Sequence, residues 1–224
     1  NAITRALEIS PNHLQARLSR ASILFSQSDH KQALEDLDFI LKEIPNEPRA
    51  KYLKAIINAT TGDPVNSQKY MSEVLITLSS VPQQIMENNP IYLYLAGVTN
   101  FQYGNLEEAQ GYLRNYLSQN EQDLDALELL ATIALRQGDI NSAKNILTKA
   151  NLYFPNQPSI LTKLGIVMME QGSPEIAQRY FEQVTSISPN FTGAKLNLAR
   201  SKMAEKKYDE AIEELVSVRM KSTQ

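Results

Sequence analysis

Apolar and polar residues follow the period of amphipathic helices along this chain, in pairs of blocks divided by a short polar turn. The blocks ALELLATIAL (126–135) and INSAKNILTKA (140–150) both repeat apolar residues at i, i+3, i+4 and i+7. Between them stands RQGD (136–139), whose glycine and aspartate are typical of a helix end followed by a helix start. The pattern therefore predicts hairpins of two antiparallel helices.

The hairpins recur with a period of 34 residues. In YGNLEEAQGYL (103–113), QGDINSAKNIL (137–147) and QGSPEIAQRYF (171–181), a glycine precedes an alanine by five residues each time. We number each unit so that this alanine is position 20 and the glycine is position 15. Position 20 then holds Ala33, Ser67, Ala109, Ala143, Ala177 and Ala211; position 15 holds Ser28, Gly62, Gly104, Gly138, Gly172 and Lys206; position 8 holds Ala21, Ala55, Gly97, Ala131, Gly165 and Ala199.

Each recurrent position has a physical reason. Glycine at position 15 permits the left-handed C-cap that ends the first helix, and the Asp, Asn or Ser after it caps the second. Pro64 and Pro174 fall in the first turn of a second helix, where a missing N–H costs nothing. Small residues at positions 8 and 20 let the helices approach, and a larger residue there costs roughly 1–3 kcal/mol. A proline ends the second helix at position 32, as Pro11, Pro45, Pro155 and Pro189.

A 34-residue helix–turn–helix unit with these positions resembles the tetratricopeptide repeat (TPR). The resemblance covers essentially the whole chain and implies an all-α fold, a right-handed superhelical solenoid of antiparallel helix hairpins. Position 4 departs from the family pattern, because none of its six residues is aromatic. We expect a single TPR solenoid over residues 1–224, made of a half-unit 1–13 and six units: 14–47, 48–89, 90–123, 124–157, 158–191 and 192–224.

The chain begins in the middle of a unit. Ala6 and Pro11 fall at positions 27 and 32, so the first residues match the second helix of an earlier unit. We therefore expect a fragment of a longer array. Its uncapped solenoid ends are expected to self-associate end to end, because solenoids normally need polar terminal helices for solubility.

The second unit carries an insertion. Ser67 and Ala109 are 42 residues apart, so eight residues are added within LITLSSVPQQIMENNP (75–90). Either the second helix runs on or the connection lengthens around Pro82. In both cases we expect a bend, or two sub-arrays that meet near residues 80–90.

A narrower resemblance is carried by EEAQGYLRNYLSQNEQDLDALELLATIALRQGD (107–139) and EPRAKYLKAI (47–56). Their alanine and leucine pattern resembles the TPR lipoproteins associated with the bacterial PEP-CTERM/exosortase and exopolysaccharide system. This resemblance implies a Gram-negative envelope assembly and a periplasmic or outer-membrane-anchored location, with a lipoprotein signal outside this sequence. Without it the compartment stays open, and the cytoplasm is the default expectation.

Composition narrows the function. A net charge of -3 and a pI near 5.5 argue against a nucleic-acid binder, which usually presents a basic stripe. Hydrophobic residues make up 42% of the chain but form no run of about eighteen, so we expect no membrane span. Cysteine is absent, which excludes disulfides, thiol nucleophiles and cysteine-based metal sites.

No catalytic motif or metal-ligand spacing occurs, so we expect no enzyme activity, no metal and no cofactor in this sequence. His13 and His30 are expected to be solvent-exposed turn residues. The acidic run NEQDLDALE (120–128) lacks a calcium loop's glycine and is interpreted as a helix start, where carboxylates complement the helix dipole. Two alternatives stay open: a regulatory part of an enzyme whose catalytic domain lies outside this sequence, and an RNA-binding helical array. The 34-residue period and the acidic balance disfavour RNA.

The TPR resemblance implies a concave groove lined by positions 2, 5, 9 and 12 of the first helices. Position 5 reads Leu18, Tyr52, Tyr94, Glu128, Thr162 and Leu196, without the lysine of the family's carboxylate clamp. An acidic chaperone tail is therefore not expected as a partner. The second and third units present apolar and aromatic residues instead, and tyrosine is favoured at binding hot spots. We predict a noncatalytic scaffold that binds a protein or peptide through Tyr52, Ile56, Ile91, Tyr94, Val98, Phe101, Phe25 and Arg49.

Overall fold

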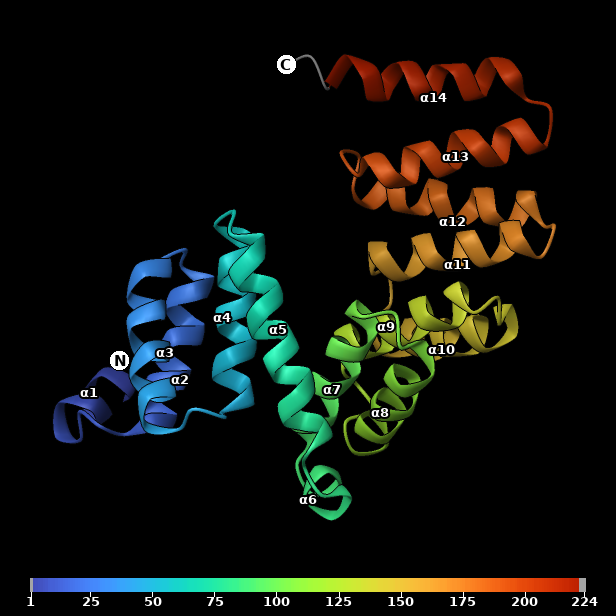
Figure 1. The fold of residues 1–224 in the computed structure, drawn as a ribbon. Helices are drawn as coiled ribbons and strands as arrows, with labels where there is room; N and C mark the ends of the chain where they lie inside the picture. The colour runs from blue at the N-terminus through green and yellow to red at the C-terminus, as the bar shows by residue number, and fades with distance from the viewer. Residues whose placement is uncertain (1, 222–224) are drawn as a thin grey trace. The chain divides into compact units, whose positions relative to one another are not determined.

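The computed structural model describes residues 2–221, and this part of the chain folds into α-helices without a β-strand (Figure 1). The predicted all-α fold is therefore confirmed. Each predicted unit holds two helices: α2 (Leu14–Ser26) and α3 (His30–Glu43), α4 (Pro48–Thr60) and α5 (Pro64–Ser79), α7 (Pro90–Gln102) and α8 (Leu106–Gln119), α9 (Leu124–Arg136) and α10 (Ile140–Tyr153), α11 (Pro158–Glu170) and α12 (Pro174–Ile187), α13 (Thr192–Ala204) and α14 (Tyr208–Lys221). Outside these pairs lie α1 (Ala2–Ile9) and α6 (Gln83–Glu87).

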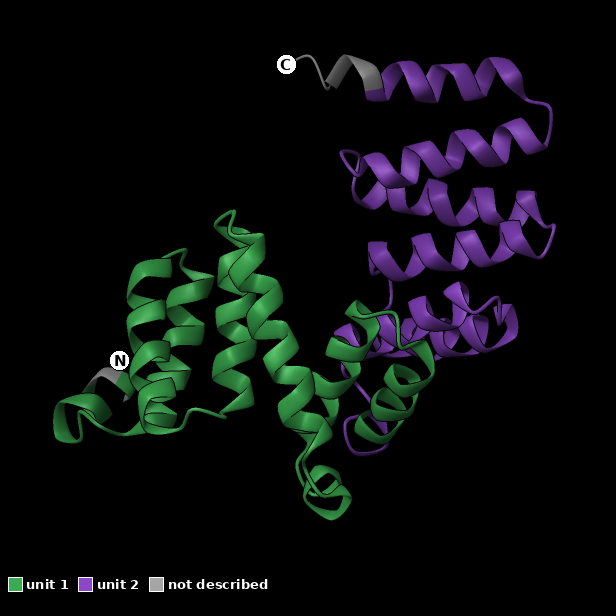
Figure 2. Ribbon diagram, in the orientation of Figure 1, with its two compact units in different colours: residues 1–116 green, residues 117–224 purple. Residues whose placement is uncertain are grey.

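The chain divides into two compact units, residues 1–116 and residues 117–224 (Figure 2). In unit 1, α1 packs on α2, α3 on α4 and α5 on α7; in unit 2, α10 packs on α11 and α12 on α13. Each unit is thus a stack of consecutive hairpins. Residues 80–90, where we expected a bend or the meeting of two sub-arrays, lie inside unit 1, and the division comes after residue 116.

The turn between the two helices of a hairpin has the same backbone geometry in every predicted unit. All six residues at position 15 have a positive φ, between 62° and 83°. Two of them, Ser28 and Lys206, are not glycine, so the turn is kept even where the residue type disfavours it. The glycines at the other four positions adopt this left-handed geometry without strain.

The prediction that a side chain caps the start of the second helix is confirmed for three aspartates. It is wrong for one serine. Asp29, Asp63 and Asp139 each accept a hydrogen bond from the backbone N–H three residues later, at 3.0–3.2 Å. Ser173 makes no side-chain cap bond to α12. The N–H of Ile176 is satisfied instead by the backbone carbonyl of Ser173 at 3.2 Å, so the hydroxyl is not needed there.

Prolines also stand where the sequence predicts them. Pro64 and Pro174 are first-turn residues of α5 and α12. Pro45, Pro155 and Pro189 directly follow the C-cap residues of α3, α10 and α12. The boundaries of the second helices therefore follow from the fixed φ and the missing N–H of proline.

Small residues at position 8 set the distance between paired helices. A Cβ added to Gly165 of α11 would stand 2.4 Å from Cε1 of Phe181 on α12. A Cβ added to Gly97 of α7 would stand 2.6 Å from Cγ of Leu113 on α8. Side chains of the second helix therefore fill the space that a position-8 side chain would need, as predicted.

The insertion in the second unit both lengthens the second helix and lengthens the connection after it, the two alternatives that the sequence left open. α5 has 16 residues against 14 in α3, and the connection after it holds the five-residue helix α6, which Pro82 precedes. Met86 of α6 is 4% exposed and joins a core cluster with Leu78 and Leu93. The added residues thus fold back on unit 1 because they contribute an apolar anchor to its core.

Candidate functional site

Unit 1 contains an apolar pocket between the first helices α2, α4 and α7. Its cavity volume is about 320 Å³. The polar lining residues are Gln15, Ser19, Ser22 and Arg49, and the apolar ones are Leu18, Tyr52, Leu53, Ile91, Tyr94 and Leu95. We call this the tyrosine pocket. Ile91 is 39% exposed, so the pocket opens to solvent at an apolar side chain.

Four of the eight residues proposed from the sequence line the tyrosine pocket: Arg49, Tyr52, Ile91 and Tyr94. The other four lie one or two helical turns further toward the hairpin turns, at positions 9 and 12; they are Ile56, Val98, Phe25 and Phe101. Val98 is 9% exposed and belongs to the core. The ring of Phe25 lies 5.7 Å from the ring of His30, within its own hairpin.

Six lining residues were not among the eight proposed. Gln15, Leu18 and Ser22 stand at the groove positions 2, 5 and 9 that the resemblance implied, whereas Ser19, Leu53 and Leu95 stand at position 6, which it did not include. Positions 2, 5, 6 and 9 are spaced i, i+3, i+4 and i+7, which is one face of an α-helix. The helical period itself therefore carried the signal, because position 6 belongs to the same face as the groove positions that the resemblance implied.

The rim of the tyrosine pocket holds a compensated charge. Arg49 Nε lies 2.8 Å from Glu47 Oε1, and Arg49 Nη1 donates to Gln15 Oε1 at 3.1 Å. The hydrogen bond to Glu47 raises the pKa of Arg49 against the effect of burial. Glu47 is 8% exposed and also accepts from the backbone N–H of Arg49 at 3.1 Å. The guanidinium is thus fixed and neutralised by a buried carboxylate, and the pocket offers mainly apolar surface.

The same helix positions carry different chemistry in unit 2. Glu128, at position 5 of α9, has its Oε2 2.6 Å from the Nζ of Lys163, at position 6 of α11. The hydroxyl of Ser159, at position 2 of α11, donates to the other oxygen of Glu128. Where unit 1 has an apolar pocket, the α9–α11 face has an ion pair supported by a hydroxyl.

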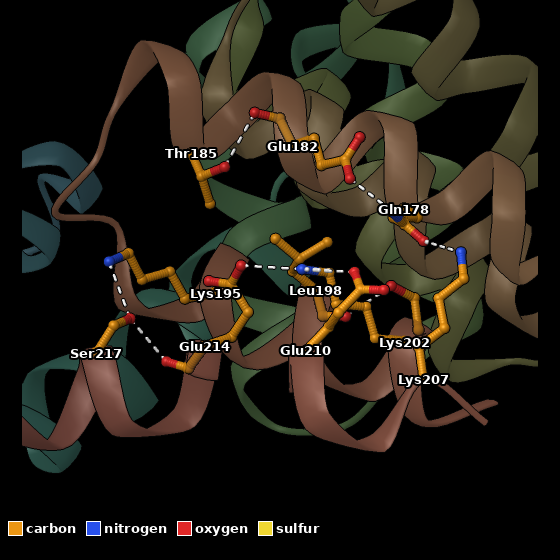
Figure 3. Close-up of polar contacts among 11 residues, drawn as sticks. Gln178, Glu182, Thr185, Lys195, Leu198, Lys202, Lys207, Glu210, Glu214 and Ser217 are labelled. Carbon is orange, nitrogen blue, oxygen red and sulfur yellow. Dashed lines mark hydrogen bonds and ion pairs between the residues drawn. The ribbon is translucent and has the colours of Figure 1, made fainter. Parts of the chain in front are cut away.

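A second polar network joins α13 to α14 (Figure 3). Lys202 is 9% exposed, and its Nζ lies 3.1 Å from Glu214 Oε1 and 3.5 Å from Glu210 Oε2. Burial opposes the charged ammonium, but the hydrogen bonds and charges of the two glutamates outweigh it, so the pKa of Lys202 is raised. Ser217 Oγ accepts from Lys195 Nζ at 3.1 Å. These contacts cross-link one hairpin, and we interpret them as structural.

The histidines and the acidic run have structural roles. His13 caps α2 by accepting from Ala16 N at 3.1 Å. His30 is half-buried beside Phe25, so the prediction that it is an exposed turn residue is wrong; the preceding hairpin helix covers it. Asp123 caps α9 by accepting from Ala126 N at 2.9 Å. Among residues 2–221 no group of three or more His, Cys, Asp or Glu side chains could hold a metal, and no helix is long and apolar enough to cross a membrane.

Comparison with known proteins identifies the family. Residues 100–164 and 168–224, together more than half of the chain, match the profile of the tetratricopeptide repeat. The chain belongs to the tetratricopeptide repeat family. The TPR fold indicates a scaffold for protein–protein interaction, and TPR proteins are in general noncatalytic.

A curated TPR protein aligns with part of the chain. The TPR repeat-containing protein MJ1428 of Methanocaldococcus jannaschii is 28% identical over 124 residues, which is 55% of this chain and 20% of that protein. The alignment thus spans about a fifth of the relative's length.

Solved TPR structures share the fold. Pseudomonas aeruginosa pilF is 17% identical, with a TM-score of 0.68 and coverage of 92% of this chain and 90% of that one. YrrB, described as a TPR protein with an unusual peptide-binding site, is 17% identical, with a TM-score of 0.57 and coverage of 87% and 96%. MamA is 20% identical, with a TM-score of 0.64 and coverage of 72% and 94%. At these identities the likeness shows the fold alone.

Proposed function

We propose that this TPR chain is a noncatalytic scaffold that binds a segment of a protein partner in the tyrosine pocket. The observation that carries the proposal is the solvent-open pocket that Tyr52, Ile91 and Tyr94 line in unit 1. Its volume of about 320 Å³ is near the lower end of the roughly 300–1,000 Å³ of typical ligand clefts. A helix or an extended segment with apolar anchors suits such a site. YrrB supports the proposal, because that protein of the same fold has a peptide-binding site.

The pocket favours apolar anchors over acidic ones. Tyr52 and Tyr94 supply large contact areas with few rotatable bonds, which is typical of hot spots. Arg49 is the charged lining residue, and Glu47 already neutralises it. A carboxylate on the partner would therefore lose its hydration for little electrostatic gain.

The test compares three forms of the chain. The parent, a pocket variant (Tyr52→Ser, Ile91→Ser, Tyr94→Ser) and a control variant (Val65→Ser, Ile76→Ser) are immobilised, and partners are captured from an extract of the source organism. Val65 and Ile76 are exposed in unit 1 but do not line the pocket. Far-UV circular dichroism first establishes that all three forms keep their helix content.

A captured protein is then purified, and its affinity is measured by calorimetry. We expect the pocket variant to bind at least about tenfold more weakly, because truncating several hot-spot residues costs more than about 1 kcal/mol each. The control variant should bind like the parent. Equal affinity of the pocket variant and the parent would exclude the tyrosine pocket as the binding site.

We also propose that the chain self-associates through α14. Position 24 is 0–5% exposed in Leu37, Met71, Leu113, Leu147 and Phe181, but 41% exposed in Leu215. Its neighbours Tyr208, Ile212 and Val216 are 45–57% exposed, at helical spacing. The proposed occupant is a helix of a second copy, packed as α13 packs on α12. Sedimentation velocity should show a concentration-dependent dimer that Leu215→Glu abolishes; a monomer at all concentrations would contradict it.

The envelope role implied by the narrower resemblance also stays a proposal. If the protein works in a Gram-negative envelope assembly, fractionation of source cells should place it in the periplasm or outer membrane. Detection in the cytoplasmic fraction alone would contradict that role while leaving the tyrosine pocket untouched.

A further inference from the structure

Another pocket of unit 1 lies near the hairpin turns, where residues of α4, α5 and the end of α7 meet. Its volume is about 460 Å³. We call it the turn pocket, and none of its residues lines the tyrosine pocket. Its seven lining residues are Ala59, Pro64, Ser67, Gln68, Met71, Gln102 and Tyr103.

The turn pocket lies where the predicted unit 48–89 departs from the repeat at two recurrent positions. Position 20 holds Ser67, which is half-buried, whereas the alanines of the other units are 0–1% exposed. Position 12 holds Ala59, whose small side chain leaves space for the cavity. The other five units have a large apolar residue at position 12: Phe25, Phe101, Leu135, Met169 and Met203. A missing large side chain and an added hydroxyl thus meet at one cavity.

Three polar side chains that line the turn pocket have no hydrogen-bond partner within residues 2–221. They are the hydroxyl of Ser67 and the carboxamides of Gln68 and Gln102. Other helical hydroxyls, such as those of Thr99 and Thr162, donate to the carbonyl four residues earlier at 2.6–2.7 Å. A hydroxyl and a carboxamide can each both donate and accept. The turn pocket therefore presents donors and acceptors that the described chain does not itself use.

The turn pocket is also neutral. None of the seven described residues that line it is charged. A charged group of a ligand would therefore lose hydration there without gaining an ion pair. Ala59 and Pro64 are exposed, so a ligand can reach apolar surface beside the polar groups. These features favour an uncharged ligand that has donors and acceptors of its own.

The two carboxamides come from different helices of unit 1. Gln68 belongs to α5 and Gln102 is the last residue of α7, and these helices pack on each other. The hydroxyl of Tyr103 donates to the backbone carbonyl of Gln68 at 3.3 Å, which ties the end of α7 to α5. A ligand in the pocket thus meets one carboxamide from each helix.

An extended polypeptide backbone has the matching arrangement of polar groups. It exposes the N–H and C=O of one residue at one edge and those of the next residue at the opposite edge. One glutamine carboxamide can donate to that C=O and accept from that N–H at the same time. We propose that the turn pocket binds an extended, uncharged segment of a protein partner through its backbone, with Gln68 and Gln102 as the paired carboxamides.

A neutral sugar also carries donors and acceptors. The TPR fold indicates a protein partner, so we favour the peptide, and sugar binding is one outcome of the test. The proposal goes beyond partner binding in the tyrosine pocket and does not depend on it.

The experiment titrates three probes into the whole chain, and NMR follows side-chain amide and methyl signals. The first is N-acetyl-Thr-Val-Thr N-methylamide, which is neutral and favours an extended backbone because its residues are β-branched. In the second, esters replace the two inner amides, so two N–H donors are lost. The third is maltose. The peptide should shift the Ala59 methyl and the Gln68 and Gln102 amide signals saturably. The ester probe should bind about tenfold more weakly, and maltose should cause no saturable shift.

Two variants and a matched control complete the test. Ala59→Leu introduces the residue that α9 has at position 12, so it should fill the turn pocket and abolish the peptide shifts without loss of helix content. Gln102→Met removes one carboxamide at nearly constant length and should weaken peptide binding about tenfold. Gln32→Met, at an exposed glutamine of α3 outside the pocket, should leave the affinity unchanged.

Several results would overturn the proposal. They are the absence of a saturable peptide shift, equal binding of the ester probe, tighter binding of maltose, and peptide binding that neither Ala59→Leu nor Gln102→Met alters. Peptide shifts at Ile91 without shifts at Ala59 would overturn it too, because they would place the peptide in the tyrosine pocket. The variants of each pocket leave the lining of the other intact, so the two proposals can fail separately.

Discussion

Two hairpins of the array, α2–α3 and α13–α14, each bury a charge between their helices, but of opposite sign. In α2–α3 the buried group is Asp36, which is 1% exposed. It accepts from Arg17 Nη1 at 2.7 Å and from Arg20 Nε and Nη2 at 2.6 and 2.7 Å. In α13–α14 the buried group is Lys202, 9% exposed, with Glu210 and Glu214 as partners.

The two hairpins depend on their buried charge to different degrees. Asp36 is short, so its carboxylate stays between the helices and relies on the arginines for all three bonds. Lys202 has a long aliphatic stem, which lets its ammonium reach toward water, and the side chain of Glu210 is 54% exposed to water. Hairpins with the same backbone turn therefore bury a charge of either sign. Only the aspartate depends on its charged partners for all of its hydrogen bonds. The pKa of Arg20 is accordingly raised, first by its hydrogen bond to Asp36.

The largest expected effect comes from removing the buried carboxylate. Asp36→Ala should lower the free energy of unfolding by about 3 kcal/mol, the lower end of the roughly 3–5 kcal/mol for breaking a buried pair, because both arginines keep some contact with water. Urea unfolding followed by far-UV circular dichroism measures the change. Hydrogen exchange assigns it to α2–α3 within unit 1.

A milder replacement separates charge from packing in that experiment. Asp36→Asn keeps the shape and one acceptor oxygen and should cost less than Asp36→Ala. If Asp36→Ala changed the unfolding free energy by less than about 1 kcal/mol, the carboxylate would matter no more than a surface charge.

The next largest effect concerns a hairpin joined by apolar contact. Gly165→Ala should destabilise unit 2 by about 1–3 kcal/mol, because the new methyl group would stand 2.4 Å from the Phe181 ring. Phe181→Ala should relieve the clash, because it removes the ring atoms that the new methyl group would meet, so Gly165→Ala should cost less in that background. A double-mutant cycle on unfolding free energies measures the coupling. Additive effects of the two changes would show that the ring is not what excludes the methyl group.

The sequence predicted the hairpins because their turns and helix contacts are local. The position-15 glycines such as Gly138 and the capping aspartates lie within a few residues of what they control, so residue type alone shows their role. The tyrosine pocket was predicted in part, since Tyr52 and Tyr94 occupy groove positions. Its boundaries depend on which side chains of three separate helices meet, and the spacing of one helix does not contain that information. For the same reason the ion pairs of Asp36 with the two arginines could not be predicted from the sequence. Asp36 stands at position 23, which holds tyrosine, isoleucine or glutamate in the other units.

Substitutions at position 15 of the hairpin turn should change the free energy of unfolding by about 1 kcal/mol, downward or upward according to the residue introduced. Gly138→Ala should destabilise, because a left-handed residue with a Cβ costs roughly 1–2 kcal/mol more than glycine. Lys206→Gly should stabilise by a similar or smaller amount, since Lys206 has a φ of 63°. Thermal unfolding of the paired variants measures both. The same sign of change for both variants would contradict the shared turn geometry.

The smallest expected effect is the removal of the buried lysine. Lys202→Met keeps the length of the apolar stem, and both glutamates can turn to water, so the unfolding free energy at neutral pH should change by less than about 1 kcal/mol. The pH dependence sharpens the comparison. Because the pKa of Lys202 is raised in the fold, its contribution is fully present below the unfolded value of about 10.4 and is lost as the pH rises through the folded value. The parent should therefore lose stability relative to Lys202→Met only in alkaline solution. A loss near 3 kcal/mol at neutral pH would mean that this hairpin depends on its buried charge as α2–α3 does.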